Sequence, residues 1–291
     1  MKKNSSIISE ARKLFHKSLI TSGVLSLSND AVASNADGSN APSKALAFCV
    51  AKKLGARIAS KLPAQTSGSL FETAICEFLT NTFPKLQHLR PGKWRICDLG
   101  NHAETQTASF AQYAHLSYLA EVMRREKQLS TVLGNDYMVA PDIVISRELC
   151  SDEEINAPQT FVDDNVSTKA DLRAANNGLP LLHASISAKW TMRSDRAQNS
   201  RTEALNLIRN RKGHLPHIVV VTGEPLPSRL ASLALGTGDL DCVYHFALYE
   251  LLDAAHEYGA NGREDIIEQL DMLVNGKRLK DISDLPLDLS C

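Results

Sequence analysis

The alternation of short apolar runs with longer helical patterns constrains this fold most. Residues 94–99, 137–146, 181–191 and 217–222 have the length and apolar content of strands. Helical patterns occupy residues 9–20, 43–61, 69–83 and 107–133, and Pro84 stops the third. Such alternation, without an internal repeat, is typical of an α/β or α+β domain.

The length and composition favour one domain. A chain of 291 residues with 43% hydrophobic content can bury a sizeable core. We predict a single domain over residues 1–291, in which residues 1–60 form an N-terminal helical extension. Residues 151–180 are rich in Asp, Asn and Ala, which predicts a long surface connection with about one helical turn.

The cysteines and the N-terminus bear on the compartment. Six cysteines are scattered without a CxxC pair, which indicates neither a zinc site nor a disulfide framework. The N-terminal MKKNSSIISEARKLF lacks the apolar core of a signal peptide, and no apolar stretch reaches membrane-spanning length. We therefore expect a soluble cytoplasmic protein with reduced thiols.

The charge is balanced overall but concentrated locally. The net charge is -1, which is not the bulk signature of a nucleic-acid binder. Between Lys189 and Gly213, however, seven Lys or Arg residues face two acidic residues. The same segment predicts a helix that starts at Ser194 or Asp195 and stops before Gly213. A basic patch therefore follows directly after an apolar strand.

The spacing around this patch brings polar groups together. Ser187 and Lys189 share one face of the strand, and Lys189 projects from its carboxyl end. Arg196 and Glu203 are seven residues apart, so they share a helical face about 10 Å long. Lys189 and Glu203 can therefore converge.

Asp142 supplies a further acid, in the stretch VAPDIVIS. Phosphodiester hydrolysis needs carboxylates that hold Mg²⁺ and a positive charge beside the attacking water. The simplest PD-(D/E)XK motif would place an acid two residues before Lys189, where Ser187 stands, so Glu203 is the candidate for the missing carboxylate. Taken singly, Asp142 also fits a turn at a strand start, and Lys189 fits a solvated strand end.

Several motifs in order resemble the CCGG-recognising type II restriction endonucleases of the PD-(D/E)XK superfamily. They are PD at 141–142, SAK at 187–189, RSDR at 193–196 and Glu203, together with stretches such as LPAQTSG, LPHIVVVT and VNGKRLKDISDLPLDL. The resemblance covers most of the chain after about residue 30, and residues 253–272 match less well. It implies a restriction-endonuclease-like α/β core, with a central mixed β-sheet flanked by α-helices.

The resemblance also implies a catalytic site. Asp142, Glu203 and Glu72 would be ligands of Mg²⁺, with two ions per active site, and the Ala188 carbonyl would complete one metal shell. Lys189 would orient and polarise the attacking water. From the residues alone, Glu72 fits equally well as an exposed acid early in a helix, where the macrodipole stabilises it.

Base recognition can be argued from chemistry as well as from resemblance. Each half of CCGG offers guanine O6/N7 acceptors and cytosine N4 donors in the major groove. Two arginines and an aspartate match these groups, and Arg193, Asp195 and Arg196 provide them. A capped helix start with incidental surface arginines is the alternative. By resemblance, Arg229 and Asp37 would read an outer G·C pair and Gln65 would reach the minor groove.

These assignments imply cleavage of GCCGGC after the first G, leaving four-base 5′ ends. The resemblance also implies a homotetramer that binds two sites on double-stranded DNA, and a cognate DNA methyltransferase in the same system. Two other functions remain open: a repair or recombination nuclease of looser specificity, and a non-catalytic DNA-binding regulator. The regulator would have little use for the acids, and the repair nuclease little use for the Arg-Asp-Arg group.

Overall fold

The computed structural model describes residues 5–100, 107–126, 141–192, 194–260 and 262–291, without the side chains of residues 194–197. A six-stranded sheet forms the centre of this described part, with the strands in chain order across the sheet. They are β1 (Trp94–Asp98), β2 (Ile143–Arg147), β3 (Leu181–Lys189), β4 (His217–Thr222), β5 (Cys242–His245) and β6 (Leu279–Asp281).

The sheet is mixed. Strands β1, β2 and β3 pair antiparallel, with a register shift between Ile145 and Ser146, and β3 to β6 pair parallel. The parallel part has helices along it, as the burial of both faces of such strands requires. The expected α/β class, with a mixed sheet flanked by helices, is confirmed.

The predicted strands occur at or close to the predicted positions. β4 has the predicted bounds, and its IVVV run is buried. β3 ends at Lys189, two residues earlier than predicted, and β1 ends one residue earlier. β2 begins at Ile143, while residues 137–140 lie outside the described part. The short strands β5 and β6 were not predicted, because four and three residues are too few for a clear alternation.

The ends of the helices differ more from the predicted positions than the ends of the strands do. α1 (Ile7–Thr21) is longer than predicted. α3 (Ala64–Thr80) begins five residues earlier and ends three residues earlier than predicted, so the prediction that Pro84 stops it is wrong. α5 (His115–Arg125) begins eight residues after the predicted start at residue 107, and residues 127–133 of that prediction lie outside the described part. α2 (Ala41–Leu54) ends at Gly55, whose φ of 78° is left-handed, so the prediction that it reaches residue 61 is wrong. The others are α7 (Asp152–Ile155), α8 (Ser194–Asn210), α9 (Pro227–Ala234), α10 (Leu248–Gly259), α11 (Glu264–Asn275) and α12 (Leu285–Asp288).

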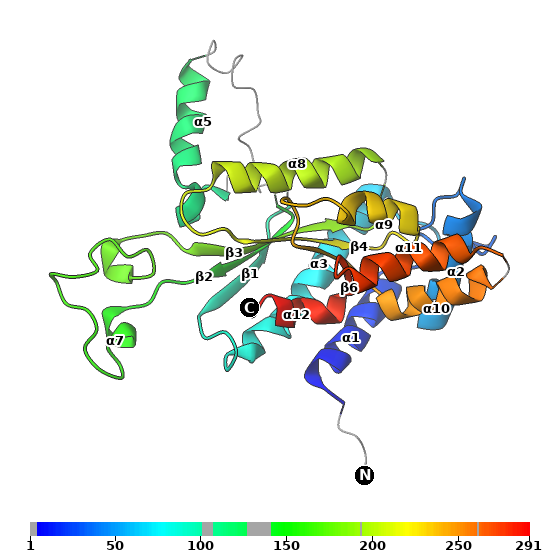
Figure 1. The fold of residues 1–291 in the computed structure, drawn as a ribbon, viewed down its shortest axis with the longest axis horizontal. Helices are drawn as coiled ribbons and strands as arrows, with labels where there is room; N and C mark the ends of the chain where they lie inside the picture. Colours follow the sequence, from blue (N-terminus) through cyan, green and yellow to red (C-terminus); the bar gives the residue numbers. More distant parts are fainter. Residues whose placement is uncertain (1–4, 101–106, 127–140, 193, 261) are drawn as a thin grey trace.

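Helices cover both faces of the sheet. α8 lies along one face and α3 lies on the other (Figure 1). α1 packs against α3, and α2 packs against α10. Buried residues from α1, α2, α3 and the sheet belong to one continuous hydrophobic core. The helices of the first 60 residues therefore contribute directly to this core.

The connection between β2 and β3 extends away from the sheet (Figure 1). It contains α7 and a 3₁₀ turn, Ala174–Asn176, so the predicted helical turn is confirmed. The Arg173 guanidinium donates two hydrogen bonds of 2.7 Å to the Asp152 carboxylate and ties the two ends of the segment together.

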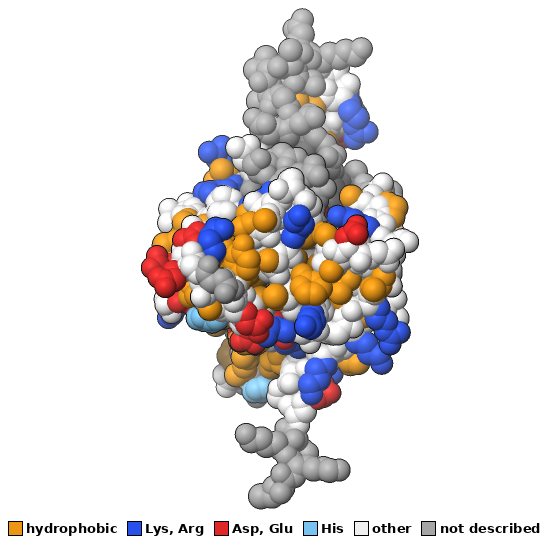
Figure 2. Space-filling view, turned by 90° about the vertical axis from the view of Figure 1, so that its right-hand side faces the viewer, with side chains coloured by type: hydrophobic (Ala, Val, Ile, Leu, Met, Phe, Trp, Pro, Cys, Tyr) orange, Lys and Arg blue, Asp and Glu red, His pale blue; other side chains and the backbone are white. Residues whose placement is uncertain are grey.

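The surface is mixed in character. On the face seen in Figure 2, basic side chains are spread around hydrophobic ones that gather across the middle. Within the described residues, no helix has the length and apolar content needed to cross a membrane.

Candidate active site beside the end of strand β3

Strands β2 and β3 bring Asp142 and Lys189 together. Asp142 directly precedes β2, Lys189 is the last residue of β3, and Ile143 pairs with Ile186 between the two strands. The Lys189 Nζ donates to Asp142 Oδ2 at 2.8 Å, and the Ala188 backbone N–H donates to the same oxygen at 2.7 Å. Both side chains are partly buried, and the Lys189 ammonium forms an ion pair with this carboxylate.

Ser187 takes a structural position where the simplest motif would have an acid. Its side chain is 8% exposed, and its Oγ donates to Asp142 Oδ2 at 3.3 Å. The same Oγ lies 3.4 Å from the Ser200 Oγ of α8. Ser187 thus links β3 to Asp142 and to the helix that carries Glu203.

Glu203 and Glu72 approach this pair from opposite faces of the sheet. Burial raises the pKa of Glu203 to about 7, the negative charge of Asp142 adds to the rise, and Lys189 opposes it. Burial also raises the pKa of Glu72, on α3, to about 7, with further contributions from Asp142 and Asp98. Both glutamates therefore interact electrostatically with the Asp142–Lys189 pair.

The donor chemistry of these acids fits a hard divalent cation. Mg²⁺ prefers carboxylate and carbonyl oxygens. A cation near Glu203 and Glu72 would oppose the effects of burial and of the Asp142 charge, which raise the pKa values of these two glutamates. Among the described residues, no three His, Cys, Asp or Glu side chains stand at the spacing of a metal site. The Asp142 carboxylate accepts hydrogen bonds from Lys189, Ala188 and Ser187, and all three go to its Oδ2.

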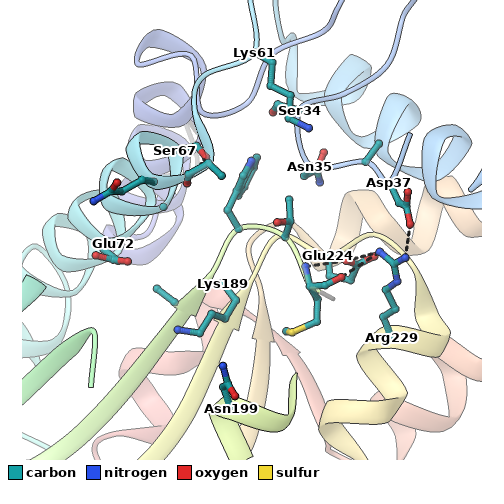
Figure 3. Close-up of a pocket in the computed structure, with 18 of the residues that line it drawn as sticks. Ser34, Asn35, Asp37, Lys61, Ser67, Glu72, Lys189, Asn199, Glu224 and Arg229 are labelled. Carbon is teal, nitrogen blue, oxygen red and sulfur yellow. Dashed lines mark hydrogen bonds and ion pairs between the residues drawn. The ribbon is translucent and has the colours of Figure 1, made fainter. Parts of the chain in front are cut away.

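One pocket of about 590 Å³ contains most of the predicted site. Glu72, Ala188, Lys189 and Glu203 line it, together with Asp37, Gln65 and Arg229. Figure 3 shows Glu72 and Lys189 on one side and the Asp37–Arg229 ion pair on the other. The residues predicted for chemistry and for outer-base recognition therefore share a cavity, although they lie far apart in the sequence.

Comparison with known proteins identifies the family. A sequence model described as NgoMIV restriction enzyme matches residues 15–291. The chain is also 51% identical over 285 residues to "Type II restriction enzyme NgoMIV" of Neisseria gonorrhoeae, which covers 98% of this chain and 99% of that protein. The chain belongs to the NgoMIV restriction enzyme family. It is therefore a type II restriction enzyme, and the resemblance inferred from the motifs is confirmed.

The RSDR segment of this NgoMIV family member is described only in part. Arg193 lies outside the described residues, and Asp195 and Arg196 belong to the first turn of α8 without described side chains. Gln65 is in the first turn of α3, and Asp37 precedes α2. The roles of these residues remain predictions.

Glu224 is a residue of the pocket that sequence reasoning missed. It is 1% exposed, and it follows β4 by two residues in the stretch IVVVTGEPL. An acid directly after a buried parallel strand is a usable signal, because ligand sites gather at the carboxyl ends of such strands. Asn35, Lys61 and Asn199 also line the pocket and carried no such signal.

Proposed function

We propose that this restriction enzyme is Mg²⁺-dependent and cuts both strands of GCCGGC after the first G, leaving four-base 5′ ends. The observation that supports this most is the shared pocket, where acids and Lys189 adjoin the Asp37–Arg229 pair. The 51% identity to a type II restriction enzyme favours this function over a repair nuclease or a regulator.

Asp142, Glu203, Glu72 and the Ala188 carbonyl are the proposed ligands of two Mg²⁺ ions. Bound Mg²⁺ would supply charge stabilisation for the phosphoryl oxygens and for the attacking water. Lys189 orients this water and polarises it. The water oxygen bonds to phosphorus as the P–O3′ bond breaks, so one product carries a 5′-phosphate and the other a 3′-hydroxyl.

Arg193, Asp195 and Arg196 are the proposed readers of the CCGG core, and Arg229 and Asp37 read the outer G·C pair. Each bidentate arginine–guanine contact contributes about 1 to 3 kcal/mol of discrimination. Gln65 contacts the minor groove. Asp37 and Arg229 pair with each other, and this ion pair lies in the same pocket as the proposed catalytic residues.

The proposed assembly is a homotetramer that engages two DNA sites. A cognate methyltransferase protects the host DNA, and the enzyme acts in the cytoplasm. Its six free cysteines agree with a reducing compartment.

Digestion of a plasmid of known sequence with Mg²⁺, followed by sequencing of the fragment ends, tests this function. We expect ends at GCCGGC with four-base 5′ extensions. Fragments that end elsewhere would contradict the specificity, and intact plasmid would contradict the activity.

A further inference from the structure

Glu224 is a nearly fully buried acid in the wall of the pocket, and the catalytic and base-reading assignments above give it no role. It lies between β4 and α9, and it is 1% exposed. Burial raises the pKa of its carboxyl, while its hydrogen bonds and Arg229 oppose the rise. A buried carboxylate costs free energy unless it is paired, so its partners indicate what it does.

The carboxylate joins two segments that flank the pocket. Its Oε2 accepts a hydrogen bond of 3.0 Å from the Met192 N–H, and its Oε1 accepts one of 3.0 Å from the Leu226 N–H. Met192 directly precedes Arg193 in the sequence, and Leu226 precedes α9. Glu224 therefore holds the backbone that leads to both groups of proposed base readers.

Arg229 is anchored by the same cluster. Its Nη1 donates to the Met192 carbonyl at 3.1 Å and lies 3.6 Å from Glu224 Oε2. Its Nη2 bonds to the Asp37 carboxylate. Dashed lines in Figure 3 mark these interactions, which meet at the guanidinium.

The cluster also reaches the catalytic strand. The Glu224 N–H donates to Thr222 Oγ1 at 3.1 Å, and Thr222 Oγ1 donates to the Lys189 carbonyl at 2.8 Å. The Gly223 N–H donates to the same carbonyl at 3.1 Å. Glu224 is thus two hydrogen bonds from the backbone of the proposed catalytic lysine.

We propose that Glu224 is a positioning residue for recognition of the outer base pair, and that its carboxylate holds Arg229 and the Met192 peptide in the geometry that reads it. This inference rests on the proposed function of Arg229. Support of the loop before α9 is the competing explanation. Such support would need only an acceptor for the Leu226 N–H, whereas Glu224 also pairs with the arginine and with a second backbone segment.

Glu224→Gln tests the inference, because it keeps the shape and an acceptor oxygen but removes the charge. The dissociation constants of GCCGGC and of ACCGGT duplexes are measured without Mg²⁺. Both duplexes contain the CCGG core and differ in the outer pair, and we expect the preference for GCCGGC over ACCGGT to fall about tenfold, within the range of one arginine–guanine contact. If the variant does not fold, Glu224→Asp, which withdraws the carboxylate, gives the same readout.

Asp281→Asn is the matched control. Asp281 is fully buried, accepts from the Leu248 and Ser283 N–H groups and pairs with Arg12, but it is on β6 and does not line the pocket. Its variant should unfold at a lower temperature with an unchanged GCCGGC preference. If Asp281→Asn lost as much GCCGGC preference as Glu224→Gln, general destabilisation would explain both losses, and the inference would be overturned.

Arg229→Ala separates this inference from the proposed function. If the wild type does not prefer GCCGGC, or if Arg229→Ala keeps the preference, the outer-pair assignment fails and the inference fails with it. If Arg229→Ala loses the preference and folded Glu224→Gln keeps it, only the role of Glu224 is overturned. In the double variant Arg229→Ala/Glu224→Gln, we expect the same loss of GCCGGC preference as in Arg229→Ala alone. A larger loss in the double variant, equal to the product of the two single losses, would contradict positioning through Arg229.

Discussion

At the residue scale, the balance between Lys189 and the surrounding acids dominates the site. The ammonium bonds to Asp142 and lowers the pKa values of Glu72 and Glu203, yet both values remain at about 7. Burial and the charges of neighbouring acids thus raise these pKa values by more than Lys189 lowers them. Further positive charge beside these acids would lower their pKa values, which agrees with the proposed Mg²⁺ dependence.

Lys189→Ala should reduce the rate of cleavage by about a hundredfold to a thousandfold or more, because it removes the group that we propose to orient the water. Binding of GCCGGC without Mg²⁺ should change little. Single-turnover cleavage and filter binding measure the two effects. Lys93→Ala, which removes an exposed lysine paired with Glu154, should leave both unchanged. Equal loss of binding in the Lys189 variant would indicate a structural role.

Glu203→Gln should change the pH dependence of stability of the metal-free protein. The folded carboxyl keeps its proton up to about pH 7, whereas the unfolded one loses it near its ordinary pKa, so ionisation favours unfolding as pH rises through this window. In EDTA, the variant should match the wild type at about pH 4, below the ordinary pKa, and melt a few degrees higher by about pH 8. Thermal unfolding at several pH values measures this, and a pH-independent difference would contradict it.

At the element scale, the ends of β3 and β4 approach each other closely at Gly223. A Cβ on Gly223 would lie 2.5 Å from the Trp190 ring and 2.7 Å from the Trp190 carbonyl. The Gly223 carbonyl also accepts from Asn35 Nδ2 at 2.7 Å. The two strand ends and the loop before α2 therefore meet where no side chain fits, and this contact sets the position of Lys189.

Gly223→Ala should destabilise the protein by about 1 to 3 kcal/mol and reduce cleavage, because the added methyl displaces Trp190 beside Lys189. Urea unfolding and cleavage rates measure both effects. Gly38→Ala is the matched control, since a Cβ there would meet nothing within 4 Å and Gly38 lines the same pocket. If the Gly223 variant were as stable as the wild type, the strand ends could move apart without cost, and the close approach would not constrain the structure.

At the scale of the whole molecule, ion pairs tie the first helix to the last strand. The Arg12 guanidinium of α1 donates to Glu250 of α10 at 2.6 Å and to Asp281 of β6 at 2.8 Å. These attractions raise the pKa of Arg12 against the effect of burial. The N-terminal helix is thereby anchored on the side of the sheet away from β1.

Arg12→Met should lower the free energy of unfolding by about 3 to 5 kcal/mol, because it leaves the buried Asp281 without its cation. The specific activity of the folded enzyme should remain near that of the wild type. Lys13→Met removes an exposed ion pair with Glu10 and should change the stability by less than about 0.5 kcal/mol. Similar urea midpoints for the two variants would contradict this role of Arg12.

The sequence by itself determined the strands that carry the site, because the IVVV run of β4 and the apolar run of β3 are unambiguous over several residues. It also placed Lys189 at a strand end and Glu203 on the following helix. Local patterns carry this information, since strand and helix periods depend on neighbouring residues. The bounds of α2 and the short strands β5 and β6 were missed because tertiary pairing and a single glycine decide them.

Only the tertiary structure decided which distant residues meet. α3, which carries Glu72, lies on the face of the sheet opposite α8 (Figure 1), and Asp37 pairs with Arg229 across 192 residues of sequence. Glu224 had no visible role until its partners, Met192 and Arg229, were in place. Contacts of this kind depend on how the helices pack on the sheet, and packing is a property of the whole core rather than of any segment.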